Sequence, residues 1–182
     1  MLNASSSLKD LRANFLATSS QSAPIAGMIY WGIIGVAALR LSPLQLMYTV
    51  GFGSGMIFPL AILIDRLRGR KFQTNDPQNP VPQLFMQSLA MVGLLWPFVI
   101  LASIQAHDAN LLVLGAAILM GIIWIFYGWA TDDPTGLRHA VARCILSYAA
   151  YLFAPSPYKA SAISVVVLLC YLYSLLSMRK SA

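Results

Sequence analysis

The sequence predicts an all-α fold: a polytopic integral membrane protein built as a six-helix transmembrane bundle, with a short amphipathic helix at its N-terminus. Hydrophobic residues make up 58% of the 182 residues and charged residues only 10%, whereas about a quarter of the residues in soluble proteins are charged. The apolar residues form runs close to the roughly 20 residues that a helix needs to cross a bilayer. Most basic residues stand at the ends of these runs. These three observations define the class.

The chain is expected to consist of a polar, amphipathic segment, residues 1–22, and a single transmembrane domain, residues 23–182. The spans leave no room for a separate soluble domain of ordinary size. A cleaved signal peptide is not indicated, because the first strongly apolar run begins only near Ala23, behind a polar leader. The six spans are expected at about residues 24–40, 43–64, 83–105, 110–130, 138–154 and 159–178.

The N-terminal segment has the pattern of a short amphipathic helix. Ser7 is followed three residues later by Asp10, an imperfect capping box with Asp where Glu or Gln is usual. Leu8, Leu11 and Phe15 follow at helical spacing. One interpretation is a helix that lies on the inner membrane surface. The other is a frayed polar leader, because the segment is short.

The distribution of basic residues predicts the topology. With the N-terminus in the cytoplasm, ten Lys and Arg residues fall on the inner side and only Arg40 and Lys159 on the outer side. Because cytoplasmic loops carry an excess of Lys and Arg, both termini are expected in the cytoplasm. The ten inner residues are Lys9, Arg12, Arg66, Arg68, Arg70, Lys71, Arg138, Arg143, Arg179 and Lys180.

The net charge of +6 is therefore interpreted as a topology signal, and nucleic acid is not an expected partner. Membrane lipids are the expected partners, with anionic headgroups at Arg66, Arg68, Arg70 and Lys71. A homo-oligomer is a further candidate partner.

Small residues interrupt the second predicted span. Its candidate binding residues are Gly51, Gly53, Ser54, Gly55 and Pro59. Gly51 and Gly55 form a small-xxx-small pair, which favours close helix packing. The other interpretation is a broken helix that lies beside protein or a water-filled cavity. Both place a backbone or a cavity wall beside Gly55, so Gly55→Leu is expected to be more harmful than Gly115→Leu.

The densest charged cluster opens the fifth predicted span. Its candidate binding residues are Asp132, Asp133, His139 and Arg143. His139, Arg143 and Ser147 share one helix face at four-residue spacing. A cation inside a span marks a functional site and needs a partner, so Arg143 is expected to pair with Asp132 or Asp133. The alternative is that Arg143 lies about one turn below the surface and snorkels to the headgroups.

Two further groups have simpler interpretations. Trp124, Tyr127 and Trp129 end the fourth span and predict an aromatic girdle at the inner interface. His107 and Asp108 resemble half of a metal or proton site, but they have no second pair of ligands nearby. A plain turn is the favoured interpretation, and no metal site is predicted.

One stretch of the chain resembles a known family. It begins with Gly55-Met56-Ile57-Phe58-Pro59-Leu60 and continues into a basic loop that closes with Asn79-Pro80. This stretch, about a quarter of the chain, is similar to a small bacterial multi-pass membrane family catalogued only as a domain of unknown function. The family has Leu after that Asn-Pro step, where this chain has Val81. The resemblance implies a location in the bacterial inner membrane, the cell membrane, and brings no activity with it.

The acidic and imidazole groups favour a transporter, a channel or an interaction module over an enzyme. The chain has no Glu, its six Asp lie at N-terminal or loop positions, and its two His are far apart. Acid/base or metal chemistry needs a convergent set of such groups, so neither catalytic residues nor a cofactor are predicted. The leading hypothesis is a small-solute or ion transport protein with a polar path near the second span and Arg143. The alternative is a non-transporting membrane scaffold or assembly partner, and Asp132, Asp133 and His139 leave a phospholipid-headgroup enzyme formally open.

Overall fold

The computed structural model describes residues 6–19, 21–69 and 79–178, and every regular element in these ranges is helical. The predicted all-α class is confirmed. The elements are α1 (Leu8–Thr18), α2 (Ser22–Ala37), α3 (Pro43–Gly53), the 3-10 helix η1 (Ser54–Met56), α4 (Ile57–Leu67), α5 (Pro80–Gln105), α6 (Ala109–Thr131), α7 (Thr135–Phe153) and α8 (Lys159–Ser177).

Four stretches of the described chain are long and apolar enough to cross a membrane, judged by length and composition. They are Pro43–Leu67, which runs through α3, η1 and α4, and the helices α5, α6 and α8. α2 is apolar but shorter, with 16 residues. α7 has 19 residues and is not among the four. The structure therefore shows an apolar helical bundle suited to a membrane, while the count of six spans stays a prediction.

The outward faces of the helices are apolar as well. Met91, Leu94, Phe98 and Leu101 lie three or four residues apart on α5 and are 59–80% exposed. A helix of a soluble protein normally shows a polar face to water, and large exposed apolar patches are rare in soluble monomers. Such a surface is suited to contact with lipid.

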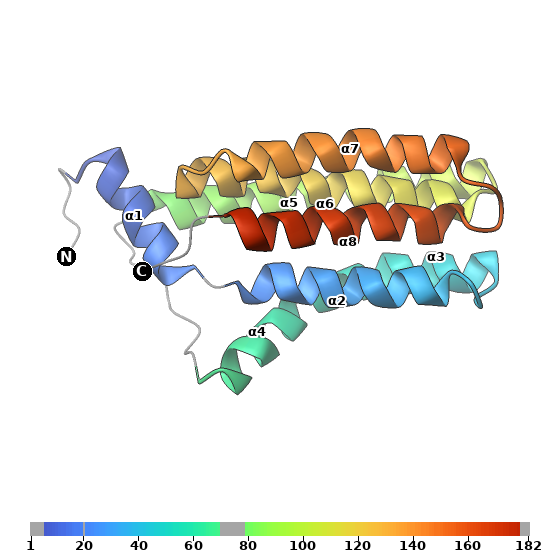
Figure 1. The fold of residues 1–182 in the computed structure, drawn as a ribbon, viewed down its shortest axis with the longest axis horizontal. Helices are drawn as coiled ribbons and strands as arrows, with labels where there is room; N and C mark the ends of the chain where they lie inside the picture. Colours follow the sequence, from blue (N-terminus) through green and yellow to red (C-terminus); the bar gives the residue numbers. More distant parts are fainter. Residues whose placement is uncertain (1–5, 20, 70–78, 179–182) are drawn as a thin grey trace.

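Figure 1 shows α2, α5, α6, α7 and α8 running along the long axis of the molecule. α6 packs against α3, α5, α7 and α8 and therefore lies at the centre, while α2 packs against α8 and α4. α1, the end of α4, the start of α5, the α6–α7 turn and the end of α8 lie toward one end of the bundle. The α2–α3, α5–α6 and α7–α8 turns lie toward the other end. This alternation is the one that a multi-spanning topology requires.

α1 is a formed helix that packs against the bundle. Its predicted capping box, Ser7 with Asp10, is present. Phe15 is buried, and its ring lies 5.8 Å from that of Phe85 and 6.3 Å from that of Tyr127. The interpretation of this segment as a frayed leader is therefore wrong over α1, because aromatic packing holds the helix in place. Its position on a membrane surface stays a prediction.

The second predicted span is broken, which agrees with the broken-helix interpretation. α3 ends at Gly53, η1 covers Ser54–Met56, and α4 diverges from the bundle axis beyond it (Figure 1). Pro59 is the third residue of α4. A proline in the first turn of a helix costs little, because that turn's N–H groups have no intrahelical acceptor. The small residues therefore end one helix and let a second one start in a new direction.

The packing role expected for Gly51 and Gly55 is wrong. A Cβ at either position would meet no atom within 4 Å. At Gly115 a Cβ would overlap the side chain of Val99 across the α5–α6 contact. We therefore expect the opposite order of tolerance at Gly55 and Gly115, because the space beside Gly55 is open while α5 and α6 lie in close contact at Gly115.

Glycines that pack helices tightly lie instead between α6 and α7. A Cβ on Gly136 would lie 2.6 Å from the Cα of Gly128, and a Cβ on Gly128 would lie 2.7 Å from the backbone oxygen of Asp133. The two backbones touch at this point, as small residues allow in membrane helices. The contact fixes how α7 lies on α6, and hence where the side chains of α7 enter the bundle.

Candidate functional site

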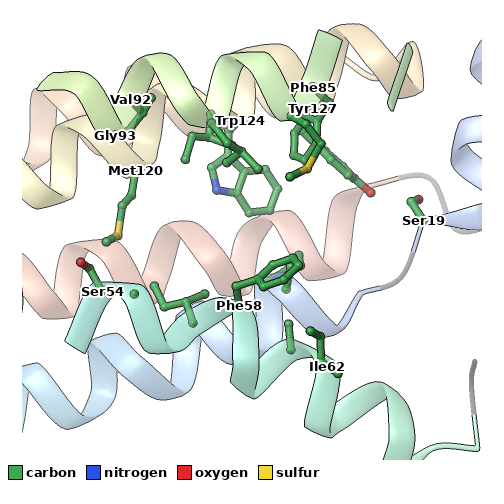
Figure 2. A pocket seen from close by; sticks show the side chains of 18 of the residues that line it. Ser19, Ser54, Phe58, Ile62, Phe85, Val92, Gly93, Met120, Trp124 and Tyr127 are labelled. Atoms are coloured by element: carbon green, nitrogen blue, oxygen red, sulfur yellow. The ribbon is translucent and has the colours of Figure 1, made fainter. Parts of the chain in front are cut away.

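A cavity of about 1050 Å³ opens between the diverging α4 and the α5–α6 pair. Figure 2 shows Phe58 and Ile62 of α4 on one side of it, and Trp124 and Tyr127 of α6 on the opposite side. Pockets that bind small molecules in proteins typically have volumes of about 300–1,000 Å³. The cavity is thus large enough for a small solute.

The helix break forms part of the cavity wall. Gly51, Ser54 and Gly55 line the cavity, and the Ser54 hydroxyl donates to the backbone oxygen of Gly51 at 2.9 Å. Gly53 does not line it: a Cβ there would lie 3.1 Å from the ring of Tyr30. Pro59 is exposed and lies outside the lining as well. Three of the five candidate residues of this span therefore lie at the cavity.

The cavity is amphipathic. Most of its lining is apolar or aromatic, and Thr18, Ser19 and Asp65 lie in it at the end of the bundle where α1 and α4 end. Figure 2 shows Ser19 at that end and Ser54 at the other. Asp65 accepts a hydrogen bond from the hydroxyl of Ser22 at 2.6 Å. A solute with an apolar body and a polar group fits such a lining better than a bare ion does.

Trp124 and Tyr171 separate the cavity from a buried polar cluster on α7. Both line the cavity. The ring of His139 stacks on Trp124 from behind, at 4.0 Å and 13°, and meets the ring of Tyr171 edge-on at 5.4 Å. His139 Nδ1 lies 2.7 Å from the Ser174 hydroxyl. Trp124 is only 6% exposed, so its predicted place in an interfacial girdle is wrong; it belongs to the core.

Arg143 is fully buried within this cluster. It stands eight residues after Thr135, the first residue of α7, which places it about 12 Å along the helix axis. Its guanidinium carbon lies 5.3 Å from the ring of Trp31 and 5.3 Å from that of Tyr171. None of its three side-chain nitrogens has a hydrogen-bond partner among the described residues. The snorkelling interpretation is therefore wrong, because the side chain reaches the bundle interior.

The predicted pairing of Arg143 with Asp132 or Asp133 is also wrong. Asp132 pairs with Arg12 of α1 at 3.1 Å, and Asp133 accepts a hydrogen bond from the backbone N–H of Thr135 at 2.9 Å. The α6–α7 turn keeps both carboxylates at the end of the bundle, while α7 carries Arg143 more than two turns away from them.

The other described carboxylates have partners elsewhere too. Asp65 accepts from Ser22, Asp108 from Tyr151 and Asp10 from Ser7. Asp76 lies outside the described residues. Within the described chain, Arg143 thus has aromatic neighbours and no acidic one.

This arrangement is costly in free energy. Burying a charged guanidinium away from water costs several kcal/mol even after the protein relaxes. Cation–π contacts of a desolvated cation return about 2 kcal/mol, and the rings of Trp31 and Tyr171 supply such contacts. A ring face accepts no conventional N–H hydrogen bond, however. A buried cation in this state is a mark of function rather than of stability.

The predicted shared face of α7 is confirmed, since His139, Arg143 and Ser147 are all fully buried. Sequence reasoning missed Trp31 and Tyr171, which lie more than 100 positions apart in the chain and meet only in the fold. It also missed Gly121 of α6, where a Cβ would lie 3.2 Å from Arg143 Cδ. The position of Trp31 in the middle of a span was the one available signal.

The candidate residues thus form three groups that the structure does not merge. Gly51, Ser54 and Gly55 lie at the cavity, and His139 with Arg143 lies behind its aromatic wall. Asp132 and Asp133 stand at the α6–α7 turn. The described residues contain no group of three or more His, Cys, Asp or Glu side chains that could hold a metal ion.

The sequence profile of a family of unknown function (DUF7010) matches residues 8–180, so the chain belongs to this family. The predicted resemblance to an uncharacterised domain of unknown function is thereby confirmed. No curated protein and no solved structure matches the chain.

Proposed function

We propose that this member of a family of unknown function is a multi-spanning membrane transport protein whose solute occupies the cavity between α4 and α5. The observation that carries the proposal is the cavity itself: a broken helix forms one wall, and an aromatic wall with a buried cation behind it forms another. Transporters commonly place substrates beside discontinuous helices, because the break frees backbone groups and space.

The proposal includes the topology of the chain. Six spans, namely α2, the broken α3–α4 segment and α5 to α8, cross the bacterial inner membrane with both termini in the cytoplasm. The alternation of turns between the two ends of the bundle supports it. Arg66 and Arg68 lie at the end of α4, where they meet anionic headgroups; Arg70 and Lys71, expected to do the same, lie outside the described residues.

The alternative function is that of a scaffold or assembly partner, a homo-oligomer included. The exposed apolar face of α5 supports it, because a partner helix would cover that face. A larger side chain that fills the cavity distinguishes the two functions. It would exclude a solute from the cavity, whereas it would not affect a partner bound to the outer face of α5.

Flux through proteoliposomes tests the proposal. The probes are octanesulfonate and octyltrimethylammonium, which share one tail and are permanently charged, so neither crosses a bilayer quickly by itself. The cavity-filling variant is Gly55→Leu, since a side chain at this position enters open space. The matched control is Gly32→Leu on α2, which also meets no atom within 4 Å and does not line the cavity.

We expect the wild-type chain to carry at least one probe, Gly55→Leu to lower that flux severalfold, and Gly32→Leu to leave it unchanged. Absence of protein-dependent flux for both probes would contradict transport of amphipathic solutes. Equal flux in the wild type and Gly55→Leu would contradict the cavity as the site.

A further inference from the structure

We propose that Arg143 binds an oxyanion, the carboxylate, sulfonate or phosphate group of an amphipathic solute whose apolar part occupies the cavity. The inference names the chemical class of the transported solute, and it rests on the proposed function for the position of the tail. The binding of the anionic group to Arg143 is a separate claim with its own test.

Arg143 carries hydrogen-bond donors that no described residue uses. A guanidinium carries five N–H donors and no acceptor, and it stays charged in proteins. Its three nitrogens are buried without a hydrogen-bond partner among the described residues. Buried polar atoms in native proteins are nearly always hydrogen-bonded. An acceptor that carries negative charge would satisfy both the donors and the charge.

The aromatic neighbours of Arg143 leave its N–H donors free to bind a ligand. Trp31 and Tyr171 lie with their rings 5.3 Å from the guanidinium carbon, so they stabilise the cation through their faces. They take up none of its N–H bonds. The planar guanidinium presents pairs of parallel N–H groups, which match the two oxygens of a carboxylate, sulfonate or phosphate better than they match a halide.

The cavity and the cluster around Arg143 share an aromatic wall. Tyr171 lines the cavity and also lies against Arg143. Space around the Tyr171 hydroxyl depends on Gly27 of α2, because a Cβ at Gly27 would overlap the phenol oxygen. Gly121 lets the Arg143 side chain pack against α6, because a Cβ at Gly121 would lie 3.2 Å from Arg143 Cδ. Because Arg143 itself does not line the cavity, an oxyanion held in the cavity reaches the guanidinium only if the Tyr171 ring moves aside.

Binding measured by thermal shift on the purified chain in a neutral detergent tests the inference without any flux. The ligands are octanesulfonate, methanesulfonate and octyltrimethylammonium, which separate the oxyanion from the tail. The variants are Arg143→Met, which removes the charge at similar length, and Arg143→Lys, which keeps the charge but loses the paired N–H groups. Gly55→Leu reports on the cavity.

We expect octanesulfonate to raise the melting temperature of the wild type and octyltrimethylammonium not to raise it. Loss of a charge-assisted hydrogen bond should weaken octanesulfonate binding about tenfold to hundredfold in Arg143→Met, with an intermediate loss in Arg143→Lys. Gly55→Leu should weaken octanesulfonate and spare methanesulfonate, which has no tail to place in the cavity.

Octanesulfonate binding that is equal in the wild type and both Arg143 variants would overturn the inference, even if the cavity transports solutes. Equal binding of methanesulfonate and octanesulfonate would overturn the part played by the tail and leave Arg143 as a site for free oxyanions. Should Arg143→Met not fold, Arg143→Lys against the wild type decides the question. Binding that depends on Arg143 in a chain without flux would refute the transport proposal alone.

Discussion

Gly128 and Gly136 set the position of α7, and through it the position of Arg143. Their backbones lie in contact, and a Cβ on Gly136 would also overlap the backbone oxygen of Trp124. Trp124 is the residue on which His139 stacks. A small shift between α6 and α7 would therefore move both the aromatic wall and the cation behind it.

We predict that Gly136→Ala destabilises the protein, because the new methyl group has backbone and not a flexible side chain in its way. Overpacking of this kind costs about 1–3 kcal/mol. The measurement is thermal unfolding in detergent, with Gly32→Ala as the control, since a Cβ at Gly32 meets nothing within 4 Å. Equal melting temperatures for both variants would show that α6 and α7 are not in backbone contact.

Part of the site could be predicted from the residues alone. Four-residue spacing was enough to place His139, Arg143 and Ser147 on one face, and that face is buried. The neighbours of Arg143 could not be predicted, because the contacts of Trp31 and Tyr171 depend on how α8 packs against α7 and how α2 packs against α8. The expected pairing with Asp132 failed for the same reason, since α1 folds back and supplies Arg12 to that carboxylate.

The docking of α1 depends on a few contacts at one end of the bundle. Besides Phe15 and Arg12, the side-chain amide of Asn79 donates to the backbone oxygen of Leu11 and to the side-chain oxygen of Asn14, both at 2.9 Å. These bonds tie α1 to the start of α5. Because α1 residues such as Thr18 also line the cavity, the docked helix closes one of its ends.

We predict that Phe15→Ala releases α1. Removal of a buried phenylalanine side chain costs about 3–5 kcal/mol, which exceeds what an ion pair with an exposed carboxylate, such as Arg12–Asp132, contributes. Hydrogen exchange over residues 8–18 should accelerate strongly, while Leu8→Ala, at a position that is 49% exposed, should leave it unchanged. Unchanged protection in Phe15→Ala would contradict the docking.

The opposite end of the bundle is held by a hydrogen bond between α7 and the turn before α6. The hydroxyl of Tyr151 donates to Asp108 at 2.7 Å. Partial burial by itself raises the pKa of Asp108, but the hydrogen bonds from Tyr151 and Asn110 and from the Leu111 backbone outweigh it and lower the pKa below its ordinary value of 3.8. The predicted turn at His107 and Asp108 is confirmed, and it serves as a helix cap.

We predict that Tyr151→Phe lowers the melting temperature at pH 7 and lowers it less at pH 3. A lowered pKa in the folded protein means stability that is fully present above the ordinary pKa of 3.8 and is lost as the pH falls below it. Melting curves at pH 7 and pH 3 check this, with the exposed Tyr148→Phe as the control. A difference that stays constant with pH would show that Asp108 is not the partner that matters.

The helices themselves were largely predictable, and the break in the second one was predictable only as an alternative. Runs of apolar residues bounded by Pro43, Asn79 and Asp108 place the starts of α3, α5 and α6 within a few residues. Whether the segment from Gly51 to Gly55 packs as a straight helix or bends depends on which neighbouring helices contact it. α6 meets α3 but not α4 among the stronger contacts, and this one-sided support leaves the segment free to turn.

We predict that the two ends of the bundle lie on opposite sides of the membrane. In a chain without Cys144 and Cys170, single cysteines at Ala106 and Ser156 should react with an impermeant reagent added to intact cells. Cysteines at Arg68 and Ser177 should react only after the cells are opened; all four positions are exposed. Labelling of Arg68→Cys in intact cells would contradict the proposed orientation. Gln73, in the same loop, offers an equivalent position outside the described residues.

Occupancy of the cavity by an amphipathic solute is tested most directly by quenching of tryptophan fluorescence with 8-bromooctanesulfonate, because bromine quenches an indole at contact. Trp124 and Trp96 line the cavity, whereas Trp129 is 45% exposed outside it. We predict saturable quenching in the wild type, loss of most of it when Trp96→Phe and Trp124→Phe are combined, and no loss in Trp129→Phe. Quenching that does not saturate, or that persists in the double variant and disappears in Trp129→Phe, would place the solute on the outer surface and contradict the cavity as its site.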